Sequence, residues 1–507
     1  MAAWSEDRIP ILVGGGQVTQ RDVEPAEALE PLRLMATAAE RAADDAWVRI
    51  EALAELDLVA VVNILGWSYA NPPGALAAHF QASPRQLWYS TLGGNTPQWL
   101  VNEIAARIAA GEVRFALLAG AEALATQQRA RRAKVPLQWS TGEAPSQPNY
   151  TLVGSNRPGA NDVEMSHGMT LPVVVYPLFE NALRVHYGHS LEEHRRYLGE
   201  FCARMAAVAA THPNAWFPVR RSAEEIATPS KENRLVSYPY TKYMNAIMEV
   251  DQGAALLLTS VACAKKLGIP PERWVYLCGC ADTQDHWFVS ERVNYWSSPA
   301  IRVATREALR MAGWTVHDID FFDLYSCFPC AVQIGRDALG IPKEDGRALT
   351  VTGGLPYFGG PGNNYVTHSI ATMLGVLRRH PGKRGLVTGL GWYITKHSVG
   401  VYSTEAPPRP FVRRDPSEYQ QEIDCMARPE VVLRPRGRGK VETYTIVHDR
   451  DGTPVRGVVI GRLPDGHRFL ANLRSDPKEL ALWEERELIG VEGEVRAEDP
   501  VNVFLPD

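Results

Sequence analysis

The sequence is poor in cysteine and has no long apolar run. Seven cysteines among 507 residues are an odd and sparse set that does not suit a disulfide framework, so we expect reduced thiols and a cytoplasmic protein. No segment approaches the roughly 20 consecutive apolar residues of a membrane span. The first ten residues also lack the basic and apolar regions of a secretory signal. The sequence therefore predicts no membrane association.

Basic residues are not in excess, and potential metal ligands are poorly spaced. Lys and Arg number 53 against 58 Asp and Glu, which gives a net charge of -5. Nucleic-acid-binding domains carry a basic face, so we predict no nucleic-acid partner. Cys327 and Cys330 form a C-x-x-C pair, but Cys278 and Cys280 fall on a different predicted strand. A zinc site needs a second suitably spaced pair, so we predict buried thiols and no metal.

Strand-like and helix-like segments alternate over most of the chain. A hydrophobic content of 45% with 22% charged residues is typical of a globular protein, and the length suggests roughly three domains. The alternation predicts an α/β fold with a largely parallel sheet. It occurs twice, so we predict one half from residues 1–125 with 244–268 and another from residues 269–405. Predicted strands cover residues 8–17, 56–65, 114–119, 254–259, 274–280, 319–324, 385–390 and 397–402, and predicted helices cover 26–47, 97–110 and 298–312.

Three segments depart from this alternation. Residues 126–243 are rich in Arg, Pro, Asn and His, and we interpret them as a loop domain that carries binding residues. Within it, the capping box of Ser190 and Glu193 predicts a helix that continues through Ala210. Residues 406–430 are rich in Pro and charge and are predicted to be a linker. Residues 431–507 contain short alternating runs around Asp-Gly turns, which predicts a small β-barrel of the OB kind.

A glycine-dense segment, residues 351–364, precedes a predicted helix that begins at Tyr365. Its glycines and prolines exclude a helix or strand interior. A glycine loop before a helix brings backbone N–H groups close to a ligand, although a buried loop whose glycines only permit close packing has the same pattern. We favour a functional role for the turn of Asn363, Asn364 and Tyr365. For His368, on the same helix face as Tyr365, we favour a role in the core.

Five segments carry motifs of a known family: GEVRFALLAGAEAL from Gly111, the helices from Tyr176, DQGAA from Asp251, DLYSCF from Asp323 and GGLPYFGGP from Gly353. In this order they resemble the thiolase superfamily over about residues 8–405, closest to its type 1 thiolase-like and sterol-carrier-protein-2-thiolase branch. The resemblance implies a duplicated thiolase fold of five αβαβα layers and descent from acetyl-CoA acetyltransferases. It also implies a coenzyme A thioester as ligand, without a permanently bound cofactor, and a role in lipid or sterol metabolism. The extra C-terminal barrel is similar to that of thiolase-like proteins of this type.

The residues that this resemblance would make catalytic are absent. A thiolase is expected to use a nucleophilic Cys at the start of a buried helix, activated by a His. The Cys position falls on or beside Gly93, and no Cys precedes Cys202. The His position falls on Gly360, and no second Cys lies near Gly389. Because nucleophile and base must both be present, we predict no cysteine-dependent thiolysis or Claisen condensation.

Other polar residues are candidates to replace them. Tyr325 stands at the position of a motif His, where it could polarise a thioester carbonyl or only fill a vacated pocket. Thiolase-like aldolases of steroid side-chain degradation resemble the chain in lacking the nucleophile and in placing a Tyr at this motif. The candidate catalytic residues are Tyr325, Cys327, Asn363, Tyr365 and His368.

The resemblance also implies where the ligand lies. Relatives bind the CoA nucleotide with their loop domain, and Arg and Lys suit phosphate, although a solvated basic surface is the alternative. The candidate ligand-binding residues are Arg220, Arg221, Lys231, Arg234, His167, Gly93 and Gly360. Three functions follow as hypotheses: a protein that binds acyl-CoA thioesters, a retro-aldol carbon–carbon lyase that uses Tyr325, and a non-catalytic scaffold whose barrel engages a protein partner. We expect a monomer or a homodimer.

Overall fold

The computed structural model describes residues 5–141, 149–474 and 476–507. The first four residues, part of the segment assessed for a secretory signal, lie outside this range. A ten-stranded sheet crosses the molecule in the order β10-β11-β12-β9-β1-β8-β4-β2-β3-β5. Its strands are β1 Pro10–Thr19, β2 Leu58–Val61, β3 Gln86–Ser90, β4 Phe115–Ala123, β5 Thr151–Val153, β8 Asp251–Ser260, β9 Val275–Gln284, β10 Phe321–Asp323, β11 Arg384–Gly391 and β12 Lys396–Ser403.

The sheet consists of two halves with the same strand order. In the first half β2 pairs parallel with β4, β4 antiparallel with β8, and β8 antiparallel with β1. The strands β10, β11, β12 and β9 repeat these three pairings in the second half. This duplication confirms the predicted repeat. The expected largely parallel sheet is wrong, because β12 follows β11 through a short turn that reverses the chain, and β8 and β1 also run antiparallel to their neighbours.

Helices complete five layers. The helices α1 Pro31–Asp45 and α2 Pro72–His79 pack on the first half, and α10 Pro299–Ala312 packs on the second. Between them lie α3 Thr96–Ala110 and α12 Tyr365–Arg379, each in contact with strands of both halves. Because α3 precedes β4 and α12 precedes β11, the loops before these two helices occupy equivalent places. The two glycine-containing loops therefore meet in the centre of the molecule.

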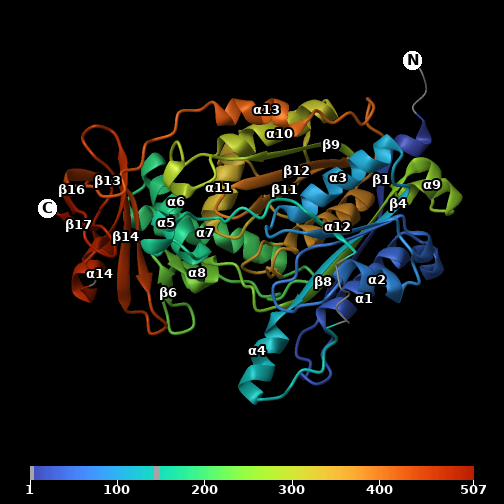
Figure 1. Cartoon of the computed structure of the whole chain (residues 1–507), viewed down its shortest axis with the longest axis horizontal. Coiled ribbons are helices and arrows are strands. Elements are labelled where there is room, and N and C mark those ends of the chain that lie inside the picture. The colour runs from blue at the N-terminus through green and yellow to red at the C-terminus, as the bar shows by residue number, and fades with distance from the viewer. Residues whose placement is uncertain (1–4, 142–148, 475) are drawn as a thin grey trace.

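The loop domain lies between the layered sheets and the C-terminal region (Figure 1). Its capping box is confirmed, because Ser190 Oγ accepts the Glu193 N–H at 3.2 Å. None of the described helices is long and apolar enough to cross a membrane. The loop-domain elements are α4 Leu124–Ala133, α5 Asp162–Ser166, α6 Pro172–His186, α7 Leu191–Ala209, α8 Ala223–Ala227, β6 Leu235–Ser237 and β7 Tyr240–Thr241, and the remaining core helices are α9 Val261–Lys266 and α11 Pro329–Ala338.

The C-terminal region is a closed five-stranded barrel. The strands β13 Gly437–His448, β14 Pro454–Arg462, β15 Arg468–Leu473, β17 Val503–Pro506 and β16 Glu492–Arg496 pair in that order, and β16 returns to β13. A helix, α14 Pro477–Glu485, lies between β15 and β16. The parallel β15–β17 pair within an otherwise antiparallel ring is the OB arrangement that the Asp-Gly turns predicted. The barrel is fixed to the loop domain, since Asn181 Nδ2 donates to the Tyr444 carbonyl at 2.8 Å.

The predicted linker, residues 406–430, is not a plain linker. It contains a helix, α13 Pro416–Asp424, that packs beside β9. Tyr419 and Ile423, one helical turn apart, are buried, and Arg413 forms an ion pair with Asp282 of β9 at 2.7 Å. The high Pro and charge content concealed this two-residue apolar face.

Candidate functional site

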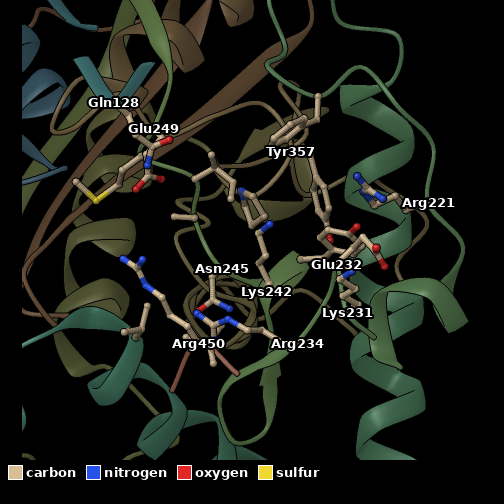
Figure 2. Close-up of a pocket in the computed structure, with 18 of the residues that line it drawn as sticks. Gln128, Arg221, Lys231, Glu232, Arg234, Lys242, Asn245, Glu249, Tyr357 and Arg450 are labelled. Atoms are coloured by element: carbon tan, nitrogen blue, oxygen red, sulfur yellow. The ribbon is translucent and has the colours of Figure 1, made fainter. Parts of the chain in front are cut away.

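A cavity of 990 Å³ opens between the loop domain, the glycine loop and the barrel (Figure 2). Six basic side chains line it against two acidic ones, Glu232 and Glu249. The basic residues come from α4, from the segment between α7 and β8 and from the β13–β14 turn, and they are Arg132, Arg221, Lys231, Arg234, Lys242 and Arg450. The cavity therefore has a strongly electropositive wall, which suits phosphate groups.

Most of these basic side chains form no ion pair with another described residue and are available to a ligand. Arg221 pairs with Glu225 and stacks over the Tyr243 ring at 3.9 Å. Within the described part of the chain, the other five basic side chains have no carboxylate within 4.0 Å. The rest of the lining includes eight apolar or aromatic residues, Val173, Phe217, Val236, Ala246, Ile247, Met248, Pro356 and Tyr357. A ligand that carries both phosphates and an apolar arm suits such a mixed lining.

The cavity adjoins the glycine loop directly. Gly360 N–H donates to the Ile247 carbonyl at 2.7 Å, and Ile247 N–H donates to the Leu355 carbonyl at 3.3 Å. The neighbouring Ala246 N–H donates to the Cys327 carbonyl at 3.1 Å. One wall of the cavity is thus hydrogen-bonded both to Gly360 and to the segment that carries Tyr325.

The predicted ligand-binding residues divide between the cavity and other places. Arg221, Lys231 and Arg234 line the cavity, whereas their neighbour Arg220 is exposed outside it. His167 requires correction, because it lies at the contact with the barrel. Its Nδ1 is 2.7 Å from the Val163 carbonyl and its Nε2 accepts the Asn502 N–H at 3.2 Å. Both ring nitrogens are thereby occupied, and His167 joins two domains instead of facing an acyl tunnel.

Sequence reasoning missed three of the basic residues. Lys242 follows Arg234 closely and Arg132 belongs to a basic run on α4, so local charge was a usable signal for both. Arg450 sits in a hairpin turn of the barrel, far along the chain. Only the docking of the barrel brings it to the cavity.

The two glycine-containing loops are joined by a single amide. Asn363 Oδ1 accepts the Gly93 N–H at 2.9 Å, while Asn363 Nδ2 donates to the Asn63 carbonyl at 3.1 Å. Gly93 has a φ of 147°, which lies outside the range that most side chains adopt. Asn363 therefore positions the backbone of Gly93.

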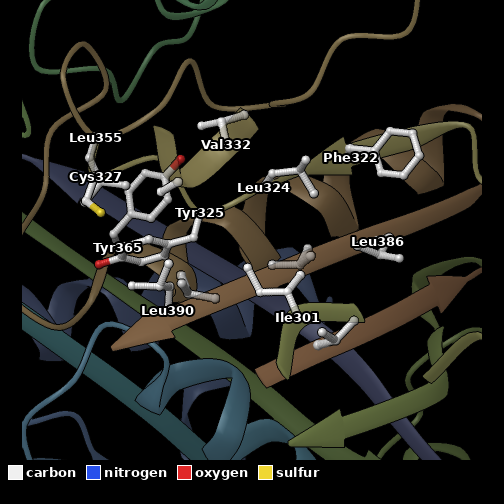
Figure 3. Close-up of a cluster of buried hydrophobic side chains, with 14 of the residues drawn as sticks. Ile301, Phe322, Leu324, Tyr325, Cys327, Val332, Leu355, Tyr365, Leu386 and Leu390 are labelled. Atoms are coloured by element: carbon white, nitrogen blue, oxygen red, sulfur yellow. The ribbon is translucent and has the colours of Figure 1, made fainter. Parts of the chain in front are cut away.

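Tyr325 fills the space beside that backbone. A Cβ on Gly94 would overlap the Tyr325 hydroxyl and lie 2.6 Å from its Cζ. Burial, with smaller effects of Cys327 and Tyr365, raises the pKa of Tyr325 well above its ordinary value, so the phenol stays protonated. No described residue accepts a hydrogen bond from its hydroxyl. Figure 3 shows the ring among apolar side chains, with Tyr365 close by.

The other candidate catalytic residues belong to the packed core. Burial raises the pKa of the Cys327 thiol to about 12, which excludes a thiolate at neutral pH. Tyr365 donates to Asp323 at 3.1 Å, and five further side-chain and backbone contacts also satisfy that buried carboxylate. Burial and His212 lower the pKa of His368 to about 3, and its Nδ1 contacts Gln17 Oε1. The contacts of these three residues are those of the packed core, which is the role expected for His368; the catalytic roles of Cys327 and Tyr365 stay predictions.

A buried carboxyl group supports the same loops. Glu122 accepts the N–H groups of Leu65 and Gly66 at 2.6 and 3.0 Å, and it lies against Gly362. Burial raises its pKa to about 7, an effect that these two hydrogen bonds only partly offset. In the unfolded chain the group ionises near 4.5. The folded state therefore binds more protons between these values, and stability falls as the pH rises through this window.

The free energy of unfolding should depend on pH because of Glu122. From pH 4.5 to 7, Glu122 is expected to remove about 3 kcal/mol of stability, at about 1.4 kcal/mol per pKa unit. Glu122→Gln abolishes the titration, so its urea unfolding should change less between pH 5 and pH 7.5 than that of the wild type. The exposed Glu200→Gln is the matched control and should keep the wild-type pH dependence. Equal pH dependence in Glu122→Gln and the wild type would contradict the assignment.

Comparison with known proteins agrees with this architecture. Residues 281–363 match the thiolase C-terminal domain-like model, and residues 418–500 match the thiolase-like protein type 1 additional C-terminal domain. Acetyl-CoA acetyltransferase IA of Candida tropicalis is 31% identical over 31% of this chain and 34% of its own length. Acetyl-CoA acetyltransferase of Chromobacterium violaceum is 32% identical over 27% of this chain and 32% of its own length. The matches span about a third of these curated relatives.

Solved structures extend the likeness to the whole chain. The human mitochondrial 3-ketoacyl-CoA thiolase is 16% identical, with a TM-score of 0.54 over 79% of this chain and all of its own. The Ltp2-ChsH2(DUF35) aldolase is 17% identical, with a TM-score of 0.60 over 79% of this chain and 99% of its own. These distant likenesses show that the chain has the fold of these two proteins. A monomeric SCP2-thiolase like protein type 1 from Mycobacterium smegmatis is 35% identical over 99% of both chains, with a TM-score of 0.85. The chain belongs to the SCP2-thiolase-like type 1 family.

Proposed function

We propose that the protein binds acyl-CoA thioesters in the 990 Å³ cavity. The observation that carries the proposal is the pairing of an electropositive wall with an apolar part of the lining that is hydrogen-bonded to the glycine loop. Lys231, Arg234 and Arg450 would bind the phosphates, and the apolar arm would pass Ile247 and Pro356. The thioester would then reach the loops that carry Gly93 and Gly360. Calorimetric titration of CoA esters against the protein tests this binding, and the absence of heat at saturating ligand would refute it.

We further propose that the family's cysteine chemistry is absent. Glycines stand at 93, 94 and 360, and Cys327 is a buried thiol with a raised pKa. Neither a nucleophile nor its activating base is available for an acyl-enzyme intermediate. Assays of acetoacetyl-CoA thiolysis should therefore give no turnover above the uncatalysed rate. A role in lipid or sterol metabolism and a cytoplasmic location complete the proposal, the latter because all seven cysteines are free thiols.

A second candidate function is carbon–carbon bond cleavage of the retro-aldol type. It is favoured by the Tyr325 hydroxyl, a protonated donor that lies beside Gly94 and has no acceptor among the described residues. A donor of this kind would stabilise the enolate oxygen that develops on a thioester when a 3-hydroxyacyl-CoA is cleaved. A purely scaffolding protein would bind CoA esters without any turnover.

Tyr325→Phe separates cleavage from binding. If Tyr325 polarises the thioester, the variant is expected to lose about 100-fold in kcat for 3-hydroxyacyl-CoA cleavage, the size of one lost donor to an oxyanion. Its Kd for the CoA ester should stay at the wild-type value, because the hydroxyl contributes in the transition state. Tyr402→Phe, which removes a buried hydroxyl bonded to Gln98, is the control. Unchanged kcat in Tyr325→Phe would exclude the role.

We propose a monomer. The outer edge of β3 is occupied by β5 of the same chain, which pairs with it from Trp88 to Ser90, so β3 is not available to a second copy. Light scattering at micromolar concentration is expected to give a mass near 56.1 kDa. A mass twice as large would show that another surface forms a dimer.

A further inference from the structure

A second cavity, of 520 Å³, lies near the start of α3 and is independent of the first, with which it shares no lining residue. Its walls come from the end of β3, the start of α3, the end of β9, the start of β12 and the start of α13. The polar side chains that matter to it are Thr91, Asn95, Asp282, Lys396 and His397. A concave site with several convergent buried polar groups is typical of a ligand-binding site.

We propose that this cavity captures a small uncharged aldehyde or ketone as an imine on the side-chain amine of Lys396. The amine nitrogen attacks the carbonyl carbon and forms a C–N bond, and a proton moves from nitrogen to the former carbonyl oxygen. Loss of that oxygen as water leaves the C=N bond. The condensation consumes the carbonyl compound, releases one water and requires no oxidant or reductant.

Lys396 is a buried amine with a single polar contact. It is 8% exposed, and its Nζ donates to the Leu92 carbonyl. No carboxylate of the described chain lies within 4.0 Å of it. Burial alone lowers the pKa of Lys396 to about 8, so an appreciable part of the amine is neutral and nucleophilic near neutral pH. A backbone carbonyl as sole partner leaves the lone pair of that neutral amine free.

Three other buried polar atoms of the cavity lining, Thr91 Oγ1, Asn95 Oδ1 and His397 Nε2, have no hydrogen-bond partner among the described residues. Thr91 Oγ1 and Asn95 Oδ1 are buried without a hydrogen bond to any described residue, although Thr91 is 3% and Asn95 7% exposed. Asn95 Oδ1 and Lys396 Nζ both lie within 2.8 Å of the point that a Cβ on Gly93 would occupy, so they face the same small space. An unsatisfied acceptor beside the amine favours a neutral ligand with a hydroxyl group over an anion.

The other titratable groups of the cavity differ from Lys396. Asp282 accepts from Asn102 Nδ2 at 3.0 Å and pairs with Arg413 at 2.7 Å. His397 Nε2 lies 3.6 Å from Asp285 Oδ2, too far for a hydrogen bond but close to a carboxylate. Lys396 is thus the amine of this cavity, and no carboxylate of the described chain pairs with it.

Reductive trapping on the intact wild-type chain tests the proposal. The protein is incubated at pH 7.5 with hydroxyacetone and sodium cyanoborohydride, and the modified lysine is found by peptide mass mapping. We expect a single adduct on Lys396, formed at least about 10 times faster than on Lys265 or Lys383, which are exposed and lie outside the cavity. Modification spread over surface lysines with no preference for Lys396 would overturn the proposal.

Two controls make the result specific. Lys396→Arg keeps the positive charge but removes the nucleophilic amine, so the fast adduct should disappear while urea unfolding reports whether the chain still folds. Acetate competes with an ion site but not with an imine site. If acetate at millimolar concentration abolishes the adduct, the cavity prefers an anion, and the proposed capture of an uncharged carbonyl compound is wrong. Labelling of the wild type that acetate does not slow supports it.

Discussion

Arg234→Glu combined with Arg450→Glu is expected to weaken the binding of acetyl-CoA by at least about 100-fold. Each substitution replaces a charge-assisted contact to phosphate, worth about 1.5–3 kcal/mol, with a repulsive charge. The two residues come from the loop domain and from the barrel, and both line the 990 Å³ cavity. Isothermal titration calorimetry of wild type and variant measures the change in Kd directly.

A neighbouring arginine provides the matched control. Arg220 adjoins Arg221 in the sequence but is exposed outside the cavity. Arg220→Glu makes the same change of charge and should shift Kd by less than about twofold at physiological salt, because screening limits exposed charges. A comparable loss of affinity in Arg220→Glu would mean that general surface charge, and not the cavity, attracts the ligand.

Gly94→Ala is expected to destabilise the protein by about 3 kcal/mol. Its methyl group would overlap the Tyr325 hydroxyl and would lie 2.7 Å from the Leu390 carbonyl, which belongs to the backbone of β11 and cannot swing away. Overpacking of this kind typically costs about 1–3 kcal/mol. Urea unfolding followed by circular dichroism gives the difference.

Two further variants identify the cause. Gly360→Ala should change stability by less than about 1 kcal/mol, because the nearest atoms to its methyl group lie at 3.1 and 3.3 Å. In a Tyr325→Leu background, Gly94→Ala should cost at least about 1 kcal/mol less than in the wild type. Equal costs in both backgrounds would show that Tyr325 does not fill the space beside Gly94.

The sequence was informative about the fold because each half has its own local pattern. Near-continuous apolar runs predicted β4 and β8, and the Asp-Gly turns predicted the hairpins of the barrel. The directions of the strands were harder to predict from the sequence. The antiparallel pairing of β8 with β1 depends on the path of the whole loop domain between them. The helix α13 was missed because its buried residues include only two apolar ones, Tyr419 and Ile423, beside the polar Gln420.

The site was less predictable, because its residues come from distant segments. The loop-domain charges Arg221, Lys231 and Arg234 followed from a resemblance, but Arg450 reaches the cavity only through the docking of the barrel. The lone His167 gave no sign that the barrel would occupy both of its nitrogens. Contacts of this long range have no periodic signature in a single sequence.

A crystal structure of the protein with acetyl-CoA bound is the most direct test of the central claim. The proposal predicts the ligand phosphates against Lys231, Arg234 and Arg450, with the apolar arm along Ile247 and the thioester beside Gly360 and Tyr325. Acetyl-CoA bound at another surface, or a cavity that stays empty at saturating ligand, would contradict it.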